Sequence, residues 1–354
     1  MLSLAGDGRA LQGFCVRMRN HQGEISMKRR EFLKKSAAGV AAVSVLNRMD
    51  PSCVLAAEPK ARIALVKTED RARGIEAALK LISFPSPQGK KVLIKPNFNT
   101  ADPTPGSTHN DTLRQLVREM RSRGASRIAV GDSCGPGNTR AVMEQKGIPA
   151  LAGEVGFDII NFDELPANDY LRFQPPGCHW KDGFEVARPV VEAEYLVWTC
   201  CLKTHQFGGI HSMSLKLAVG VTRKNSRFSD LHADQNTIRF KIAEINYAFA
   251  PQVILMDGVD IFVDGGPMTG KLVRAGVVVA GTDRIAVDAV GLAVLKYHGS
   301  NQAIMSRKIF EQEQLTRAME LGLGIKGPDQ IEIITADAAS RNYAAELEEI
   351  LNRG

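Results

Sequence analysis

Short apolar segments alternate with amphipathic helices in the first part of the chain after residue 60. Strands are expected at Arg62–Val66, Lys90–Pro96 and Ser126–Gly131, with helices at about 71–81 and from Ser107 or Thr108 to Arg123. This β-α-β-α-β order favours a parallel sheet, because parallel neighbours need a long crossover connection that is usually helical. The sequence therefore predicts an α/β fold of the Rossmann-like kind, with helices on both faces of a mostly parallel, mixed sheet.

The remainder of the chain continues this pattern without an internal repeat or a long linker. Trp180 and the turn at Pro175–Gly177 predict a hairpin-like excursion, so part of the strand pairing is expected to be antiparallel. Residues 58–354 are expected to form one α/β domain, and a division into two lobes is left open. Further strands are predicted at Phe157–Phe162, Phe184–Pro189, Tyr195–Cys201, Gln252–Met256, Val273–Ala280 and Gln330–Ile334, and helices near 236–249, 284–297, 304–321 and 338–351.

The positive charge of the chain is concentrated at its N-terminus. The formal net charge is +6, but residues 1–56 carry nine basic and four acidic residues, and the remainder carries 36 basic and 35 acidic residues. A nearly neutral body gives no electrostatic argument for binding nucleic acid. We therefore predict no nucleic-acid partner.

A basic motif and a short apolar run follow one another near the N-terminus. Lys28–Lys34 resembles the twin-arginine export motif, and the apolar run Ala37–Leu46 is too short for a bilayer, which needs about 20 residues. Small residues then offer cleavage sites at Val54–Ala56 or Leu55–Ala57. A basic amphipathic helix is the alternative interpretation.

The resemblance to a twin-arginine signal implies a division of the chain and a destination. Residues 1–26 are expected to be an upstream extension without ordered structure, and residues 27–57 the signal peptide. The twin-arginine translocase would be a partner during export, and the mature protein would be periplasmic or extracellular without a stable membrane span. This route carries folded proteins, often with a cofactor already inserted.

Four cysteines follow the expected signal peptide: Cys134, Cys178, Cys200 and Cys201. An oxidising compartment permits disulfides, but the sequence does not decide among the three full pairings. The chain contains no C-x-x-C motif, so we predict neither an iron–sulfur cluster nor a zinc ribbon.

The segment from Lys203 to His232 gathers residues suited to chemistry near neutral pH. A buried strand at Tyr195–Thr199 leads into it, so Lys203 and His205 are expected at the carboxyl edge of the sheet, where open α/β sheets bind ligands. The alternative is a solvated basic loop, and His211 is expected at the surface or capping a helix. The segment also contains Gly208, Gly209, Lys216, Arg223, Lys224 and His232.

Acidic residues also follow several of the predicted strands. If those strands are parallel, the carboxylates meet on one rim with Lys95, Asn97 and Lys203, where they can hold a metal or act as acid and base. Capping of the next helix is the alternative, especially for Asp283. The residues concerned are Asp132, Asp257, Asp260 and Asp283.

An ordered set of short motifs spans about residues 62–335. The set consists of Ile94–Asn97, Ser107–His109, Val130–Ser133 with Thr139–Arg140, Lys203–His205, Lys216 with Gly220, His232, Asp257–Gly258, Gly266–Pro267 with Gly270, and Ala280–Asp283 with Val287–Ala289. Through these motifs the chain resembles the DUF362 family.

The run His205, Gly208–Gly209, Lys216, Gly220 and His232 is also remotely similar to the nickel-dependent lactate racemase family. That resemblance implies that Lys216 tethers a nickel pincer cofactor, that His232 ligates the metal, and that His205 moves a proton or hydride. The chain has neither a histidine at Gly131–Thr139 nor an arginine near Asp102, where that family has catalytic and substrate-binding groups, which argues against lactate racemisation itself.

These observations lead to one functional prediction with an alternative. The chain is predicted to be an exported enzyme that uses a divalent transition metal such as nickel, or a metal-organic cofactor, on a small anionic substrate. The alternative is a non-catalytic periplasmic protein that binds a small-molecule ligand or a metal. The assigned residues are Lys203, His205 and Asp257 for catalysis, Lys95, Asn97, Gly208, Gly209 and Lys216 for cofactor binding, and His205 and His232 for the metal.

Overall fold

The computed structural model describes residues 15–20, 23–28 and 60–353. Strands β1 (Cys15–Asn20) and β2 (Gly23–Lys28) pair as an antiparallel hairpin, which the sequence analysis does not anticipate. Residues 29–59, which carry nearly all of the expected twin-arginine signal, lie outside the described residues.

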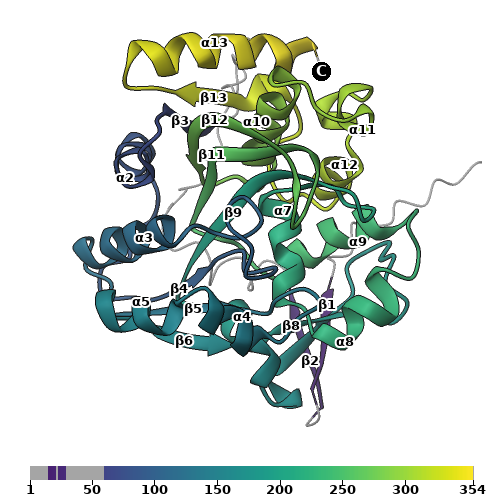
Figure 1. The fold of residues 1–354 in the computed structure, drawn as a ribbon. Helices are drawn as coiled ribbons and strands as arrows, with labels where there is room; N and C mark the ends of the chain where they lie inside the picture. The colour runs from purple at the N-terminus through teal and green to yellow at the C-terminus, as the bar shows by residue number, and fades with distance from the viewer. Residues whose placement is uncertain (1–14, 21–22, 29–59, 354) are drawn as a thin grey trace, which may run out of the picture. The chain divides into compact units, whose positions relative to one another are not determined.

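Residues 60–353 are built around a nine-stranded sheet (Figure 1). Its strands follow the order β13-β3-β12-β11-β9-β4-β5-β6, and the short β10 adds to β9. Their bounds are β3 Ala61–Lys67, β4 Lys91–Lys95, β5 Arg127–Asp132, β6 Asp158–Asn161, β9 Tyr195–His205, β10 Ile210–Ser212, β11 Val253–Gly265, β12 Gly270–Gly281 and β13 Ile331–Ile334.

The pairing confirms a mixed, mostly parallel α/β sheet. β11, β9, β4, β5 and β6 form consecutive parallel pairs, whereas β12 runs antiparallel to both of its neighbours because it returns from β11 in a hairpin. The separate strands β7 (Tyr170–Phe173) and β8 (Phe184–Ala187) pair antiparallel, which confirms the predicted excursion around Trp180.

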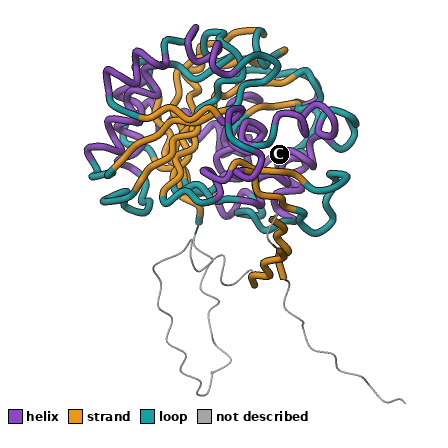
Figure 2. Tube along the Cα trace, turned by 90° about the horizontal axis from the view of Figure 1, so that it is seen from below, coloured by secondary structure: helices purple, strands orange, loops and turns teal. Residues whose placement is uncertain are grey.

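Helices cover both faces of the sheet (Figure 2). On one face α2 (Arg71–Leu81), α3 (Asn110–Ser122) and α5 (Ile148–Val155) pack together and against the sheet. The second layer contains α7 (Ser214–Leu217), α9 (Ile238–Ile245), α10 (Arg284–Tyr297), α12 (Glu313–Glu320) and α13 (Ala338–Arg353). The remaining helices are α4 (Thr139–Gln145), α6 (Arg188–Val191), α8 (Lys224–Ser226) and α11 (Gln302–Met305).

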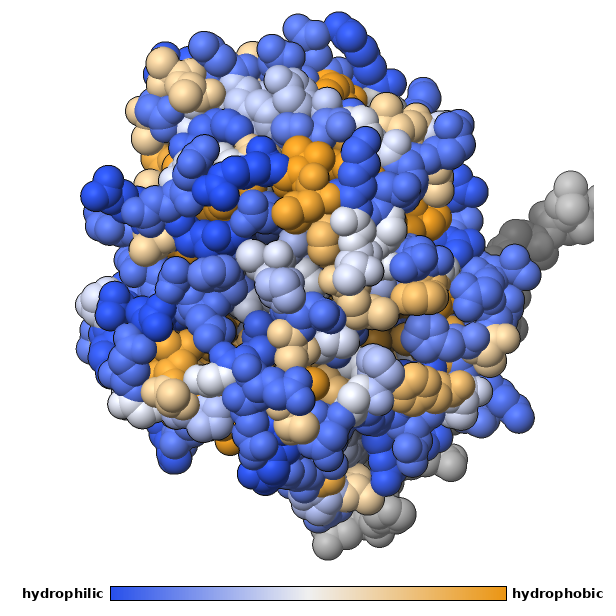
Figure 3. Space-filling view, in the orientation of Figure 1, coloured by the Kyte–Doolittle hydropathy of each residue, from blue (hydrophilic) through white to orange (hydrophobic). Residues whose placement is uncertain are grey.

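The central strands are apolar on both sides because both of their faces are covered. All eleven residues of β9 are buried. Val197 and Leu255 face the core shared with α2 and α3, and successive residues alternate between the two faces of a strand. The outer surface is different: hydrophilic side chains dominate the face shown in Figure 3, with small apolar patches near its centre.

Three helices begin with N-cap residues of the common types, whereas the N-cap predicted for α3 is not used. Asp70, Asn138 and Asp283 cap α2, α4 and α10 through side-chain oxygens, as residues of their type commonly do. The predicted cap of α3 at Ser107 or Thr108 is wrong, because those hydroxyls bond Thr100 and Asn97 instead. Nδ1 of His109 accepts the hydrogen bond from the amide of Asp111 at 3.1 Å.

Several predicted strands are longer in the structure, and one predicted helix is broken. β9 continues past Cys201 to His205, so Lys203 and His205 lie within the strand. β11 continues past Met256 to Gly265, so Asp257 and Asp260 lie within the strand rather than beyond it. The helix predicted near 304–321 is broken into α11 and α12, with a short 3₁₀ turn at Ile309–Glu311 between them. Among the described residues, none of the helices combines the length and apolar character needed to cross a bilayer.

Candidate functional site

A pocket of about 440 Å³ opens at the carboxyl edge of β4, β5 and β9. It lies where the parallel strands deliver their loops, as ligand pockets of open α/β sheets do. The residues that line it are Lys95, Asn97, Asn99, Asp132, Ser133, Gly135, Pro136, Lys203, His205, Phe207, Ser212, Lys216, Leu217, Val219, Gly220, Arg227, Phe228, His232, Gln235, Pro267 and Met268.

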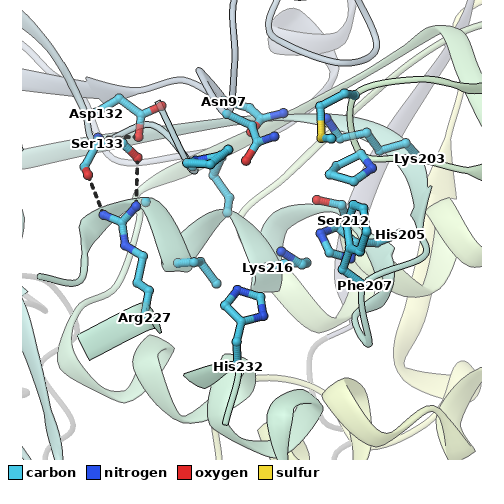
Figure 4. A pocket seen from close by; sticks show the side chains of 18 of the residues that line it. Asn97, Asp132, Ser133, Lys203, His205, Phe207, Ser212, Lys216, Arg227 and His232 are labelled. Atoms are coloured by element: carbon cyan, nitrogen blue, oxygen red, sulfur yellow. Dashed lines mark hydrogen bonds between the residues drawn. The ribbon is translucent and has the colours of Figure 1, made fainter. Parts of the chain in front are cut away.

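The view into this pocket separates its polar side chains into groups (Figure 4). Asp132, Ser133 and Arg227 lie on one side, and Lys203, His205 and Ser212 lie on the other. Lys216 and His232 lie between the two groups, and Asn97 lies across from them. Residues far apart in the sequence, from Asn97 to His232, therefore meet around one cavity.

The first charged group is the buried pair Lys95–Asp132. Nζ of Lys95 lies 2.7 Å from Oδ1 of Asp132, and both side chains are almost fully buried. Asp132 also accepts the amides of Phe98 and Ser133, each at 2.7 Å. Burial lowers the pKa of Lys95 and raises the pKa of Asp132, and the attraction between the two charges opposes both shifts.

Gly220 allows this pair to form. A methyl group at Gly220 would lie 2.5 Å from Oδ1 of Asp132 and 2.7 Å from Nζ of Lys95. Such distances are too short for any side chain, so the backbone at Gly220 is part of the wall that encloses the pair.

Arg227 is buried, and its guanidinium group donates hydrogen bonds to protein oxygens. It lies on a single π-helical turn, η4 (Arg227–Leu231), and donates to the carbonyls of Ser133, Cys134 and Thr222 at 3.2, 2.7 and 2.7 Å and to Oγ of Ser133 at 2.6 Å. None of these acceptors is charged. Arg227 therefore fixes the loop after β5 and contributes positive potential, while its donors are already used.

Lys203 and Lys216 have no carboxylate partner among the described residues. Nζ of Lys203 donates to the carbonyl of Gly106 at 2.5 Å, and Nζ of Lys216 makes no hydrogen bond or ion pair in the described part of the chain. Burial lowers the pKa of Lys203 to about 8, and burial together with Lys203 and Arg227 lowers the pKa of Lys216 to about 7. Lys216 is thus close to half protonated at neutral pH.

His205 is buried beside Lys216 and is held neutral. Burial, followed by the nearby charges of Lys216 and Lys203, lowers its pKa well below the ordinary value. Its Nδ1 is buried and has no hydrogen-bond partner among the described residues. A buried, unpaired ring nitrogen carries a free-energy cost that a bound ligand can relieve.

A tight turn brings His205 and Lys216 together. Gly208 has a φ of 78°, and a methyl group at Gly209 would lie 2.7 Å from Cε of Lys216 and 3.0 Å from Nδ1 of His205. The next residue, Ile210, has a φ of 66°, which is strained for a β-branched side chain. The amide of His211 bonds the carbonyl of Gly209 across it at 2.8 Å, as in a γ-turn.

The protein side chains alone do not suit a metal ion. His205 and His232 both line the pocket, but no group of three or more His, Cys, Asp or Glu in the described part of the chain is arranged to hold one. The neighbouring Lys203, Lys216 and Arg227 would also repel a divalent cation. We therefore assign no step to a metal.

The structure places Asp257 away from this cavity. Oδ2 of Asp257 accepts from Nε of Arg71 at 2.9 Å and from Oγ1 of Thr112 at 2.7 Å, and Asp257 is not among the lining residues. Asp260 pairs with the same arginine at 2.6 Å. Asp283 lies at the opposite edge, because β12 runs against the parallel strands, and it caps α10. Of the four carboxylates expected on the rim, Asp132 alone lines the pocket.

Other members of the basic segment also turn away from the cavity. Arg223 lies 3.4 Å from Glu185, and Lys224 lies 2.8 Å from Asp163. His211 is buried in β10, not exposed or capping a helix as predicted. Cys134, Cys178, Cys200 and Cys201 all have free thiols.

Several lining residues escaped sequence reasoning. Arg227 looks no different in sequence from Arg223, since both lie in the same basic run and neither has a distinctive spacing. Phe207 and Phe228 are single aromatic residues in polar surroundings. Only the fold distinguishes these three residues from similar ones, because it buries Arg227 and leaves the two phenylalanines exposed at the cavity.

Comparison with protein families places this site within a recognised domain. The match covers residues 92–293, more than half of the chain, and includes β5, β9, all but the first residue of β4, and every polar group that lines the pocket. Comparison with curated proteins finds no match to the chain. The chain therefore belongs to the family described as Domain of unknown function (DUF362).

Proposed function

We propose that the pocket binds a small anion carrying a carboxylate, phosphate or sulfate group, with Lys216 as the main binding residue. One observation carries this proposal: the ammonium of Lys216 points into the pocket without a partner in the described part of the chain. Lys95, Lys203 and Arg227 also line the pocket, and Asp132 supplies the single carboxylate of its lining.

An anion would offset the imbalance of charge in this pocket. Four cationic side chains and one carboxylate leave up to three positive charges without an opposite charge. At 4 Å and an effective dielectric constant near 20, one opposite charge interacts by roughly 4 kcal/mol. Lys203, Ser212 and Asn97 are near enough to the cavity to supply further hydrogen bonds to the same group.

A second candidate is an enzyme that moves a proton on the bound anion. The specific observation in its favour is the pair Lys216 and His205, which pack against the same Gly209. A lysine with a pKa of about 7 has both its acid and its base form available near neutral pH, which is where general acid–base catalysis is most effective. The neutral imidazole of His205 can accept a hydrogen bond from the same ligand.

We further propose that the protein is exported to the periplasm or beyond by the twin-arginine route. The support is the sequence of Arg29–Arg30 followed by the short apolar run. A fusion of residues 27–57 to a reporter should be exported, and replacing both arginines by lysine should abolish export. Unchanged export of the double variant would contradict this route.

Calorimetric titration with sulfate tests the anion proposal. Sulfate should bind the wild-type protein, and Lys216→Met should weaken binding at least tenfold, because a hydrogen bond to a charged group contributes about 1.5–3 kcal/mol. Lys90→Met is the matched control, since Lys90 is exposed at the other end of β4, and it should bind as the wild type does. Equal binding by the Lys216→Met variant, or no binding of sulfate, phosphate or acetate by the wild type, would overturn the proposal.

A further inference from the structure

Two exposed aromatic rings line the pocket together with its polar side chains. Phe207 and Phe228 both line the pocket, and their exposed fractions are 49% and 56%. Single exposed apolar residues are ordinary on protein surfaces. Two exposed phenylalanines on the wall of the same cavity are a different case, because a ligand that enters it meets both side chains.

Each ring is held in place by a histidine that also lines the cavity. Phe207, in the turn between β9 and β10, meets His205 edge-on with centroids 5.9 Å apart. Phe228, on η4, stacks on His232 with centroids 6.3 Å apart and the planes 26° from parallel. Aromatic rings favour both arrangements, so the two phenyl groups are positioned by the pocket itself.

Other residues that line the pocket are also apolar. Leu217 and Val219 line it from the segment that begins with α7, Pro267 and Met268 from the β11–β12 connection, and Pro136 from the loop after β5. The cationic side chains come from the ends of β4 and β9, from α7 and from η4, and three of the four are almost fully buried. The lining of the cavity thus combines buried cationic side chains with apolar side chains, several of which are exposed.

We propose that the ligand is an amphiphilic anion, with its acidic group at Lys216 and an apolar ring or chain against Phe207 and Phe228. This inference rests on the proposed anion binding and adds the chemical class of the ligand. An inorganic anion would leave both phenyl rings in water. A ligand that buries about 60 Å² of apolar surface against them would gain roughly tenfold in affinity.

Three sulfonates of equal charge test this inference, because they differ only in the apolar group. Methanesulfonate, benzenesulfonate and hexanesulfonate should be titrated into the full chain by calorimetry. We expect benzenesulfonate or hexanesulfonate to bind at least tenfold more tightly than methanesulfonate, and the tighter of the two identifies a ring or a chain. Equal affinity for all three would overturn the inference.

Variants connect the preference to the two rings. The double variant Phe207→Ser/Phe228→Ser should lose the preference and keep its affinity for methanesulfonate, and Phe207→Leu/Phe228→Leu should keep most of the preference for hexanesulfonate. Leu272→Ser is the control, since Leu272 is 57% exposed and is not a lining residue. It should behave as the wild type does, and a preference that survives the double serine variant would also overturn the inference.

The same titrations separate this inference from the anion proposal. If the wild type binds none of the sulfonates, anion binding itself fails. If it binds all three equally and Lys216→Met binds none, anion binding stands and the amphiphilic ligand is rejected.

Discussion

Two clusters of buried charge lie in the same α/β body, and they are balanced differently. Around Arg71, one guanidinium meets two carboxylates: Asp257 at 2.9 Å and Asp260 at 2.6 Å. In the pocket, four cationic side chains meet the single carboxylate of Asp132. The pKa of Arg71 is raised because its partners outweigh burial, whereas burial lowers the pKa of Lys216 to about 7.

The contrast separates structural charges from charges that await a ligand. Asp257 is also bonded by Thr112, so the first cluster joins β11, α2 and α3 and leaves few donors or acceptors free. Lys216 has no partner in the described part of the chain, and neither does the buried Nδ1 of His205. A folded protein rarely leaves a buried polar atom unpaired without a reason. Functional assignment therefore depends on which charges lack partners, more than on which residues are charged.

The largest expected effect comes from removing one carboxylate from the cluster of Arg71, Asp257 and Asp260. Asp257→Asn should lower the free energy of unfolding by about 2 kcal/mol, because hydrogen bonds to a charged group contribute about 1.5–3 kcal/mol and Arg71 keeps Asp260 as its other partner. Denaturant unfolding measures this change. Asp264→Asn, at an exposed position of the same strand, is the control and should shift stability by less than about 0.5 kcal/mol.

The same variant tests whether Asp257 also acts in the pocket. Sulfate affinity should be unchanged in the folded Asp257→Asn protein, because Asp257 does not line the cavity. A stable variant with weakened sulfate binding would contradict the claim that Asp257 takes no part in the pocket.

A smaller effect is expected from adding a methyl group beside Lys216 and His205 in the pocket. Gly209→Ala should weaken sulfate binding about tenfold, because the new methyl group would lie 2.7 Å from Cε of Lys216 and 3.0 Å from Nδ1 of His205 and must displace one of them. Titration of the purified variant checks this. Gly153→Ala is the matched control: Gly153 lies in α5 with no atom within 4 Å of the added group, and alanine there should stabilise the helix by about 0.5–1 kcal/mol and leave binding unchanged. Equal affinities in the two variants would contradict the placement of the anion at Lys216.

The smallest expected effect is a dependence of binding on pH. Sulfate remains a dianion between pH 6 and 8, while Lys216 loses its proton as the pH rises through about 7. Because the protonated form binds the anion, affinity should fall by up to about tenfold from pH 6 to pH 8, with proton uptake on binding at the upper end. Calorimetry in buffers of different ionisation enthalpy measures both quantities. Lys216→Met should show a weaker dependence, because Lys203, with a pKa of about 8, still loses its proton toward the upper end of this range. A pH-independent wild type would place the binding charge elsewhere.

The order of elements and the location of the pocket could be predicted from sequence. Apolar strands separated by amphipathic helices predict parallel pairing, and parallel pairing places Lys95, Asp132 and Lys203 at one edge. The sequence also predicted correctly that Asp283 can cap a helix, because capping depends on residues next to each other in the chain.

The tertiary structure decided which of these charges are free. Asp257 was predicted to be catalytic because it follows an apolar run, but β11 continues through it and brings it against Arg71, 186 residues away in sequence. Asp283 lies at the opposite edge of the sheet because β12 runs antiparallel. Arg227 lines the pocket because it bonds the loop after β5. Local patterns determine strands, helices and their caps, since these depend on neighbouring residues. The partner of a buried charge is set by strand direction and long-range packing, so only the folded chain shows that Lys216 has none among the described residues.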